Sequence, residues 1–164
     1  MSFESRTDRI RQCGPGVRRL IEKKRAAFPF RIAGAHTAHH GTAYDPKGLA
    51  VEPVFGPAAG SVDEFLAGAR PEVVIEITPL NPESGEPAIS HIRVTFRRGM
   101  HVVTANKGPV AFAYAELAEE DRRCGVEFRQ EAATMDGTPV YNVVRNNLPG
   151  VTVNGFAGAL NSTT

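Results

Sequence analysis

The stretch Val102–Pro109 (VVTANKGP) decides the fold class that the sequence predicts. It begins as an apolar, β-branched run, which is typical of a strand. Gly108-Pro109 then stops this run, and a helical pattern begins at Val110. In a parallel α/β sheet, the loops after the carboxyl ends of the strands form the edge that binds ligands. We therefore expect Asn106 and Lys107 to lie where chemistry would be done.

Helix and strand signals alternate on both sides of this stretch. The predicted strands are Phe30–Ala35, Val73–Ile77, His101–Thr104, Val126–Glu131 and Val151–Ala157. The predicted helices are Val17–Phe28, a short helix from Ser61 to about Leu66, Ala88–Arg98, Val110–Arg123 and Pro139–Asn147. Residues 36–60 are predicted to be mostly irregular. The alternation predicts right-handed crossovers, and hence an α/β, doubly wound, mostly parallel sheet with helices on both faces.

Composition favours small-molecule chemistry or protein contact. The chain has 164 residues, enough for one domain with a proper core, and its 19 Lys and Arg nearly balance its 18 Asp and Glu. This balance provides no basic field for nucleic acid or an acidic membrane. Cys13 and Cys124 form no CxxC pair, and no segment has the apolar length of a leader or a membrane span. We expect a cytoplasmic protein that binds neither nucleic acid nor membrane.

Four segments, in this order, resemble the homoserine dehydrogenase family. They are VVIEITPLNPESGEPAISHI (73–92), VVTANKGPVAFAYAEL (102–117), EAATMDGTPVYNVVRNNLPG (131–150) and GFAGALNSTT (155–164). The resemblance covers about residues 30–164. It implies a Rossmann-like NAD(P)-binding domain over 17–150 and the start of a substrate and dimerisation domain over 151–164. It also implies oxidation of L-homoserine, or reduction of L-aspartate 4-semialdehyde, by a homodimer in amino-acid biosynthesis (threonine and methionine).

The resemblance assigns roles where the motifs match. Lys107 is implied as the catalytic residue, beside nicotinamide and substrate. The implied cofactor-binding residues are Thr78, Asn81, Ala105, Asn106 and Lys107, and the implied substrate-binding residues are Asn161, Ser162 and Thr163. A monovalent cation such as sodium is implied at the Glu131 carboxylate, with carbonyls from Thr134, Asp136 and Thr138. Threonine and asparagine after a strand are also good turn formers, and a glutamate at a strand end is commonly just solvated.

The amino-terminal part departs from a dinucleotide fold. Such a fold begins with an apolar strand that leads into GxGxxG. Gly14 and Gly16 supply two of the three glycines and are the candidate pyrophosphate contacts, whereas Arg19 stands in the third position. Residues 7–13 are too polar for a central parallel strand. We therefore expect residues 1–16 to be a degenerate or disordered segment in which the first strand is lost.

The chain ends at Thr164, near the start of the family's substrate domain. We expect a truncated oxidoreductase that turns over homoserine poorly or not at all as an isolated chain, and that lacks the dimerisation region. The alternative is a non-catalytic remnant that acts as a nucleotide-binding or protein-association module.

His36, His39 and His40 form a conspicuous cluster between Gly34 and Gly41. Imidazoles at this spacing can bind a metal on a helix, but the flanking glycines favour an exposed polar loop. No acidic residue stands here to bind a ribose 2′-hydroxyl, so NADP is preferred over NAD as the cofactor.

Overall fold

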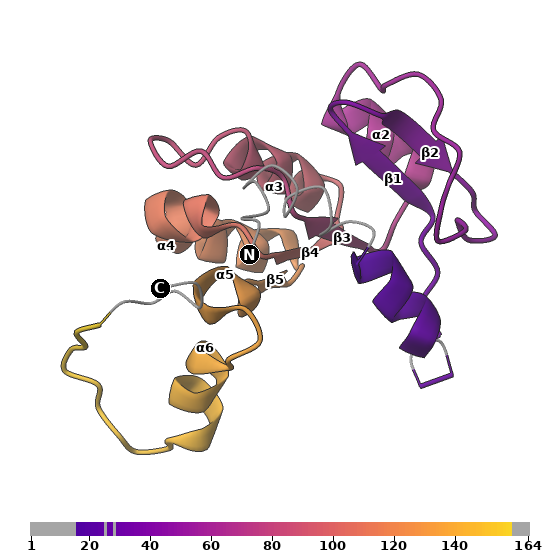
Figure 1. The fold of residues 1–164 in the computed structure, drawn as a ribbon. Coiled ribbons are helices and arrows are strands. Elements are labelled where there is room, and N and C mark those ends of the chain that lie inside the picture. Colours follow the sequence, from indigo (N-terminus) through magenta and orange to yellow (C-terminus); the bar gives the residue numbers. More distant parts are fainter. Residues whose placement is uncertain (1–15, 25, 28, 159–164) are drawn as a thin grey trace, which may run out of the picture. The chain divides into compact units, whose positions relative to one another are not determined.

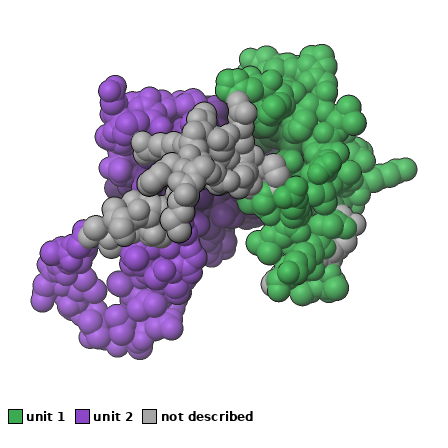
Figure 2. All heavy atoms as spheres, in the orientation of Figure 1, with its two compact units in different colours: residues 1–72 green, residues 73–164 purple. Residues whose placement is uncertain are grey.

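The computed structural model describes residues 16–24, 26–27 and 29–158. The chain divides into two compact units, residues 1–72 and 73–164 (Figure 2). The predicted nucleotide-binding domain, 17–150, includes parts of both units and stays a prediction. Within the described residues, no helix combines the length and apolar character that crossing a membrane requires.

The first unit contains a β-hairpin and a helix. Strand β1 (Gly34–Thr37) pairs antiparallel with β2 (Gly41–Tyr44), and α2 (Val62–Ala69) follows. The Ser61 side chain caps α2 by accepting a hydrogen bond from the Glu64 amide, as its capping box predicts. Residues 16–24 are also helical, which confirms most of the helix predicted there.

The prediction for the region after Phe30 was wrong. The strand begins at Gly34 and not at Phe30, and residues 41–44, expected to be irregular, form β2. Gly41 has φ of 90°, which lets the chain turn back on itself. The signal was weak because β2 is short and consists of Gly, Thr, Ala and Tyr, and only its packing into the unit makes it a strand.

The second unit is a parallel α/β sheet (Figure 1). Strands β3 (Val73–Glu76), β4 (His101–Thr104) and β5 (Phe128–Arg129) lie in the order β3-β4-β5 and are all parallel. Helices α3 (Ala88–Arg97) and α4 (Lys107–Cys124) make the connections. Three short elements follow, namely α5 (Ala132–Met135), α6 (Val140–Asn142) and the π-helix η1 (Val143–Asn147). The α/β class with a parallel sheet is confirmed.

The core of this unit lies between the sheet and the two long helices. Its buried members are Ile89, Ile92 and Phe96 from α3, Val102 from β4, Ala113 and Leu117 from α4, and Val126 and Phe128 around β5. Side chains alternate along a strand, and Val73, Ile75 and Val103 are exposed. Coverage of this second face by helices therefore stays a prediction.

One ion-pair cluster joins α3 to α4. Arg93 donates to Glu116 at 2.7 Å and to Glu120 at 3.0 Å. Burial alone would lower the pKa of Arg93, but the hydrogen bonds and charges of Glu120 and Glu116 outweigh it and raise that pKa above its ordinary value.

The ends of several elements differ from expectation. Helix α4 begins at Lys107, three residues before the predicted start, because Asn106 caps it. The predicted strand 126–131 shortens to the two residues of β5. The helix predicted over 139–147 is present as α6 and η1. The strand predicted over 151–157 was wrong, because this stretch is exposed and pairs with no strand of the described chain.

Candidate functional site

The candidate site lies at the carboxyl ends of β3 and β4. Glu76, the last residue of β3, pairs in register with Thr104, the last residue of β4. Glu76 is only 4% exposed. The carboxylate accepts three hydrogen bonds, from the Thr78 amide at 2.8 Å, the Thr78 hydroxyl at 2.5 Å and the Thr104 hydroxyl at 2.6 Å. A carboxylate buried at this depth requires such donors, because burial without them is strongly unfavourable.

These contacts continue into a closed ring of hydrogen bonds. The Thr104 hydroxyl accepts from the Asn106 amide at 3.0 Å. The Asn106 side-chain amide donates to the Thr78 carbonyl at 3.1 Å, which returns the ring to Glu76. The oxygen of the same side chain, Oδ1, accepts a hydrogen bond from the Gly108 amide at 3.0 Å and caps α4. The ring therefore fixes the first residue of α4, which is Lys107.

The Lys107 side chain is held at its far end as well. Its ammonium donates to the carbonyls of Ala133 at 2.7 Å and Thr134 at 2.8 Å, on the short helix α5. An ammonium has three N–H donors, and the third has no partner within the described residues. A charge held this way can polarise a carbonyl group and stabilise negative charge that develops on its oxygen.

Two glycines bring a loop against the start of α4. A Cβ atom on Gly108 would lie 2.7 Å from the Gly85 Cα, closer than any side chain tolerates. Gly85 also has φ of 71°, a conformation that favours glycine. The Asn81 side chain shapes this loop by accepting from the Glu83 and Ser84 amides, so its observed contacts are those of a turn former. A cofactor contact for Asn81 stays a prediction.

The loop predicted to bind a monovalent cation already uses several of its oxygens. The Glu131 carboxylate accepts from the Tyr141 amide at 2.8 Å and the Asn142 amide at 3.3 Å. The Thr134 carbonyl accepts from Lys107, and the Thr138 carbonyl accepts from the Val140 amide. No group of three or more His, Cys, Asp or Glu side chains in the described chain is placed to hold a metal ion. The cation site built on carbonyls stays a prediction.

Other predicted site residues lie elsewhere. Gly16 begins the described helical residues in the first unit, and a Cβ atom there would meet nothing within 4 Å. His36 lies in the hairpin, where its Nδ1 is 2.8 Å from the Thr42 hydroxyl. Gly14 and the substrate-binding candidates, Asn161, Ser162 and Thr163, lie outside the described residues.

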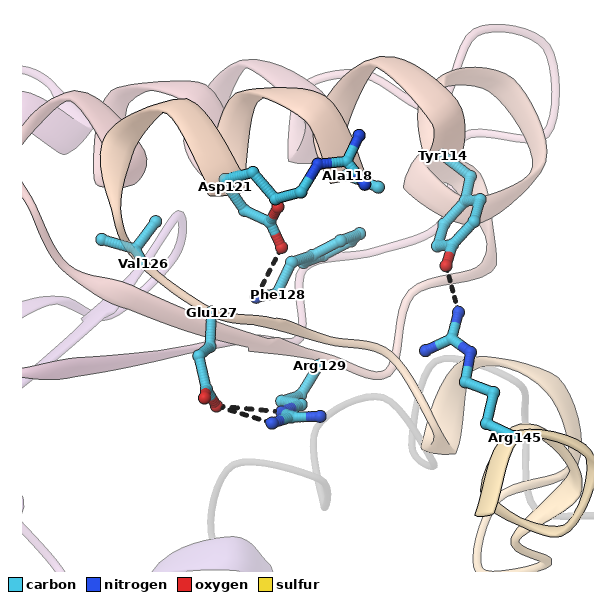
Figure 3. Close-up of a pocket in the computed structure, with 9 residues that line it drawn as sticks. Tyr114, Ala118, Asp121, Val126, Glu127, Phe128, Arg129 and Arg145 are labelled. Carbon is cyan, nitrogen blue, oxygen red and sulfur yellow. Dashed lines mark hydrogen bonds and ion pairs between the residues drawn. The ribbon is translucent and has the colours of Figure 1, made fainter. Parts of the chain in front are cut away.

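A pocket of about 340 Å³ lies between the second half of α4, β5 and η1 (Figure 3). Its lining is largely polar and includes none of the predicted site residues. Several of its charged groups are engaged within the pocket: Arg129 donates to Glu127 at 2.8 Å, Asp121 accepts from the Phe128 amide at 3.2 Å, and Arg145 donates to the Tyr114 hydroxyl. The pocket therefore does not add to the chemistry at Lys107.

Comparison with curated proteins identifies the relatives. The homoserine dehydrogenase of Methanocaldococcus jannaschii is 46% identical over 112 residues, which are 68% of this chain and 33% of that protein. The chain is a partial homologue of the homoserine dehydrogenase family. An NAD(+)-dependent homoserine dehydrogenase of Pseudomonas canavaninivorans is 45% identical over 92 residues, 56% of this chain and 26% of that relative. The chain thus spans about a third or less of the length of these homoserine dehydrogenases. No family model matches it.

Solved homoserine dehydrogenases share the fold. The crystal structure from Thermoplasma acidophilum matches with a TM-score of 0.70 at 21% identity, over 83% of this chain and 46% of that chain. A hyperthermophilic archaeal homoserine dehydrogenase in complex with NADPH matches with a TM-score of 0.68 at 22% identity, over 84% and 46%. At these identities the likeness establishes the fold, and it confirms the Rossmann-like α/β class.

Sequence reasoning missed two parts of this candidate site. One is Glu76, whose signal was a lone carboxylate inside the otherwise apolar run VVIEI. The other is the pair of carbonyls from Ala133 and Thr134, which bind Lys107. Backbone carbonyls carry no residue-type signature, so no pattern in the sequence could have identified them.

Proposed function

We propose that this chain supplies the nicotinamide side of a homoserine dehydrogenase, which interconverts L-homoserine and L-aspartate 4-semialdehyde with NADP or NAD. The observation that carries the proposal is the ammonium of Lys107. It follows the carboxyl end of a parallel strand, and two backbone carbonyls fix its position. An ordinary solvated lysine at a strand end has no such support.

The residues after β3 and β4 fit a nicotinamide cofactor. The side chains of Thr78 and Asn106 serve the buried ring, so the exposed Ala105 and the ammonium of Lys107 are the groups that would face the cofactor. Bound NADPH would supply the hydride. We favour NADP because a structural neighbour is an NADPH complex, although the Pseudomonas canavaninivorans relative is NAD(+)-dependent. Gly14 and Gly16 would contact the pyrophosphate.

Lys107 would act on the substrate oxygen. Its third N–H can donate to the aldehyde oxygen and stabilise the negative charge that grows there as the carbonyl is reduced. The same ammonium can then give up a proton to that oxygen. Because the carbonyls of Ala133 and Thr134 already orient it, little reorganisation is required in the transition state.

The remaining parts of the proposal depend on the sequence resemblance. Asn161, Ser162 and Thr163 would contact the amino-acid substrate, and Glu131, Thr134, Asp136 and Thr138 would contact a monovalent cation such as sodium. Action in the cytoplasm completes the proposal.

The experiment measures binding first and turnover second. The purified full chain is titrated with NADPH and followed by nicotinamide fluorescence, and reduction of aspartate semialdehyde is then assayed at saturating NADPH. Lys107→Met keeps most of the length of the side chain and removes its charge, and we expect it to lower any turnover by about a hundredfold. The exposed Lys47→Met is the matched control and should leave turnover unchanged. A chain that binds neither NADPH nor NADH would overturn the proposal.

A further inference from the structure

We propose that Tyr141 is a positioning residue for Lys107 and acts through the turn that holds the ammonium. This role rests on the proposed function, since a positioned ammonium matters only if Lys107 takes part in the reaction. The phenol and the amide of Tyr141 fasten both sides of that turn, which spans residues 131–138.

The turn contains a short helix. Helix α5 has four residues and ends at Asp136, whose φ of 49° and ψ of −110° lie outside helical geometry. Beyond the bonds within the helix, backbone hydrogen bonds join the Ala133 amide to the Gln130 carbonyl and the Thr138 amide to the Met135 carbonyl. A single helical turn is marginal by itself, so contacts from outside must hold its carbonyls in place.

Tyr141 provides these contacts at two points. Its amide donates to the Glu131 carboxylate at 2.8 Å, just before α5. Its phenol oxygen accepts from the Thr134 hydroxyl at 2.7 Å, and Thr134 is one of the two residues whose carbonyls bind Lys107. Thr134 is 9% exposed and Ala133 is 1% exposed, so water has little access to replace these bonds. One side chain therefore links α6 to the residue that orients the ammonium.

A further contact returns this region to α4. Arg145 of η1 donates to the Tyr114 hydroxyl on α4, as Figure 3 shows. The Arg145 guanidinium also lies over the rings of Tyr114 at 6.0 Å and Tyr141 at 5.8 Å. The segment that carries Tyr141 is thus bound to the helix that begins at Lys107. Tyr141 is therefore connected to Lys107 both through Thr134 and through α4.

The test removes one oxygen atom at a time. Tyr141→Phe deletes the phenol oxygen, Thr134→Val deletes its donor, and Thr134→Ser keeps that donor. Tyr44→Phe, which deletes the same atom from an exposed tyrosine in the other unit, is the matched control. Each full-length variant is treated with limiting acetic anhydride, and the rates at Lys107 and at Lys47 are measured by peptide mass spectrometry. Amide hydrogen exchange in α3 and β4 reports whether the second unit stays folded.

We expect Tyr141→Phe and Thr134→Val to raise the Lys107-to-Lys47 rate ratio about threefold to tenfold, because the loosened turn releases the ammonium. Exchange in α3 should not change, and Thr134→Ser and Tyr44→Phe should match the wild type. An unchanged ratio in Tyr141→Phe would overturn the proposal. So would a raised ratio accompanied by equally faster exchange in α3, since that outcome means general loosening of the unit. The readout needs no turnover, so its failure is distinct from failure to bind NADPH or to reduce the aldehyde.

Discussion

Replacement of Glu76 tests whether the buried ring supports the candidate site. Glu76→Ala removes the acceptor of three hydrogen bonds, whereas Glu76→Gln keeps one oxygen and presents a donor to the second threonine. The exposed Glu83→Gln, in the same unit, makes the same chemical change without touching the ring. Both Glu76 variants should lower the free energy of unfolding of the second unit, and the control should not.

The magnitude follows from two opposed terms. Hydrogen bonds to a charged group contribute about 1.5 to 3 kcal/mol each, so the three bonds of Glu76 amount to roughly 4.5 to 9 kcal/mol. Removing the carboxylate also relieves its burial, which costs several kcal/mol. The difference is a loss of about 2 to 4 kcal/mol for Glu76→Ala and about 1 to 2 kcal/mol for Glu76→Gln. Against a typical domain stability of about 5 to 15 kcal/mol, this loss is large.

The assay is urea unfolding, followed by circular dichroism because the chain has no tryptophan. Hydrogen exchange measured peptide by peptide assigns the change to β3 and β4. A double-mutant cycle with Thr104→Val sharpens the test, because that substitution should cost about 1 kcal/mol less once its acceptor is gone. The reasoning is refuted if Glu76→Ala lies within about 0.5 kcal/mol of Glu83→Gln, the range of ordinary surface substitutions.

Two further predictions concern how α4 is held. Gly108→Ala should lower the free energy of unfolding of the second unit by about 1 to 3 kcal/mol, and with it the melting temperature, because the new Cβ would overlap Gly85. A Cβ on Gly137 would meet nothing within 4 Å, so Gly137→Ala should change the stability little, and equal shifts in the two variants would contradict the close contact. Arg93→Met should lower the free energy of unfolding by at most about 1 kcal/mol, and mainly at low salt, because its two ion pairs are partly exposed. The same loss for the exposed Arg97→Met would show that the ion pairs contribute nothing specific.

The sequence predicted the elements whose boundaries carry their own chemistry. Helix α2 has its Ser61 cap, β3 is an apolar run between two prolines, and α3 is closed by Gly99. Strand β2 was not predicted, because the sequence GTAY carries no strand signal apart from its packing. The strand prediction over residues 151–157 was wrong for the opposite reason. Their apolar pattern is that of a strand, but they pair with no strand of the described structure. Strands depend on partners that a local pattern does not contain.

The candidate site was predictable only in its centre. Lys107 follows from the end of the VVTANKG strand, but its two carbonyl partners lie 26 and 27 residues further along the chain. The role of Asn106 as helix cap was also hidden, because the predicted helix began at Val110. Local spacing identifies the residue that could react, while the groups that orient it are brought together by the parallel sheet.

The two supports of Lys107 act on different parts of the same residue. The ring of Glu76, Thr104 and Asn106 fixes its backbone at the start of α4, and the turn at Thr134 fixes its ammonium. The backbone support alone would leave the charge free to move, since a lysine side chain has four rotatable carbon bonds. Burial of the Glu76 carboxylate is unfavourable in free energy, and a solvated lysine at this strand end would not require it. A preorganised charge lowers a reaction barrier because it is oriented before the reaction begins, and these two supports together meet that condition.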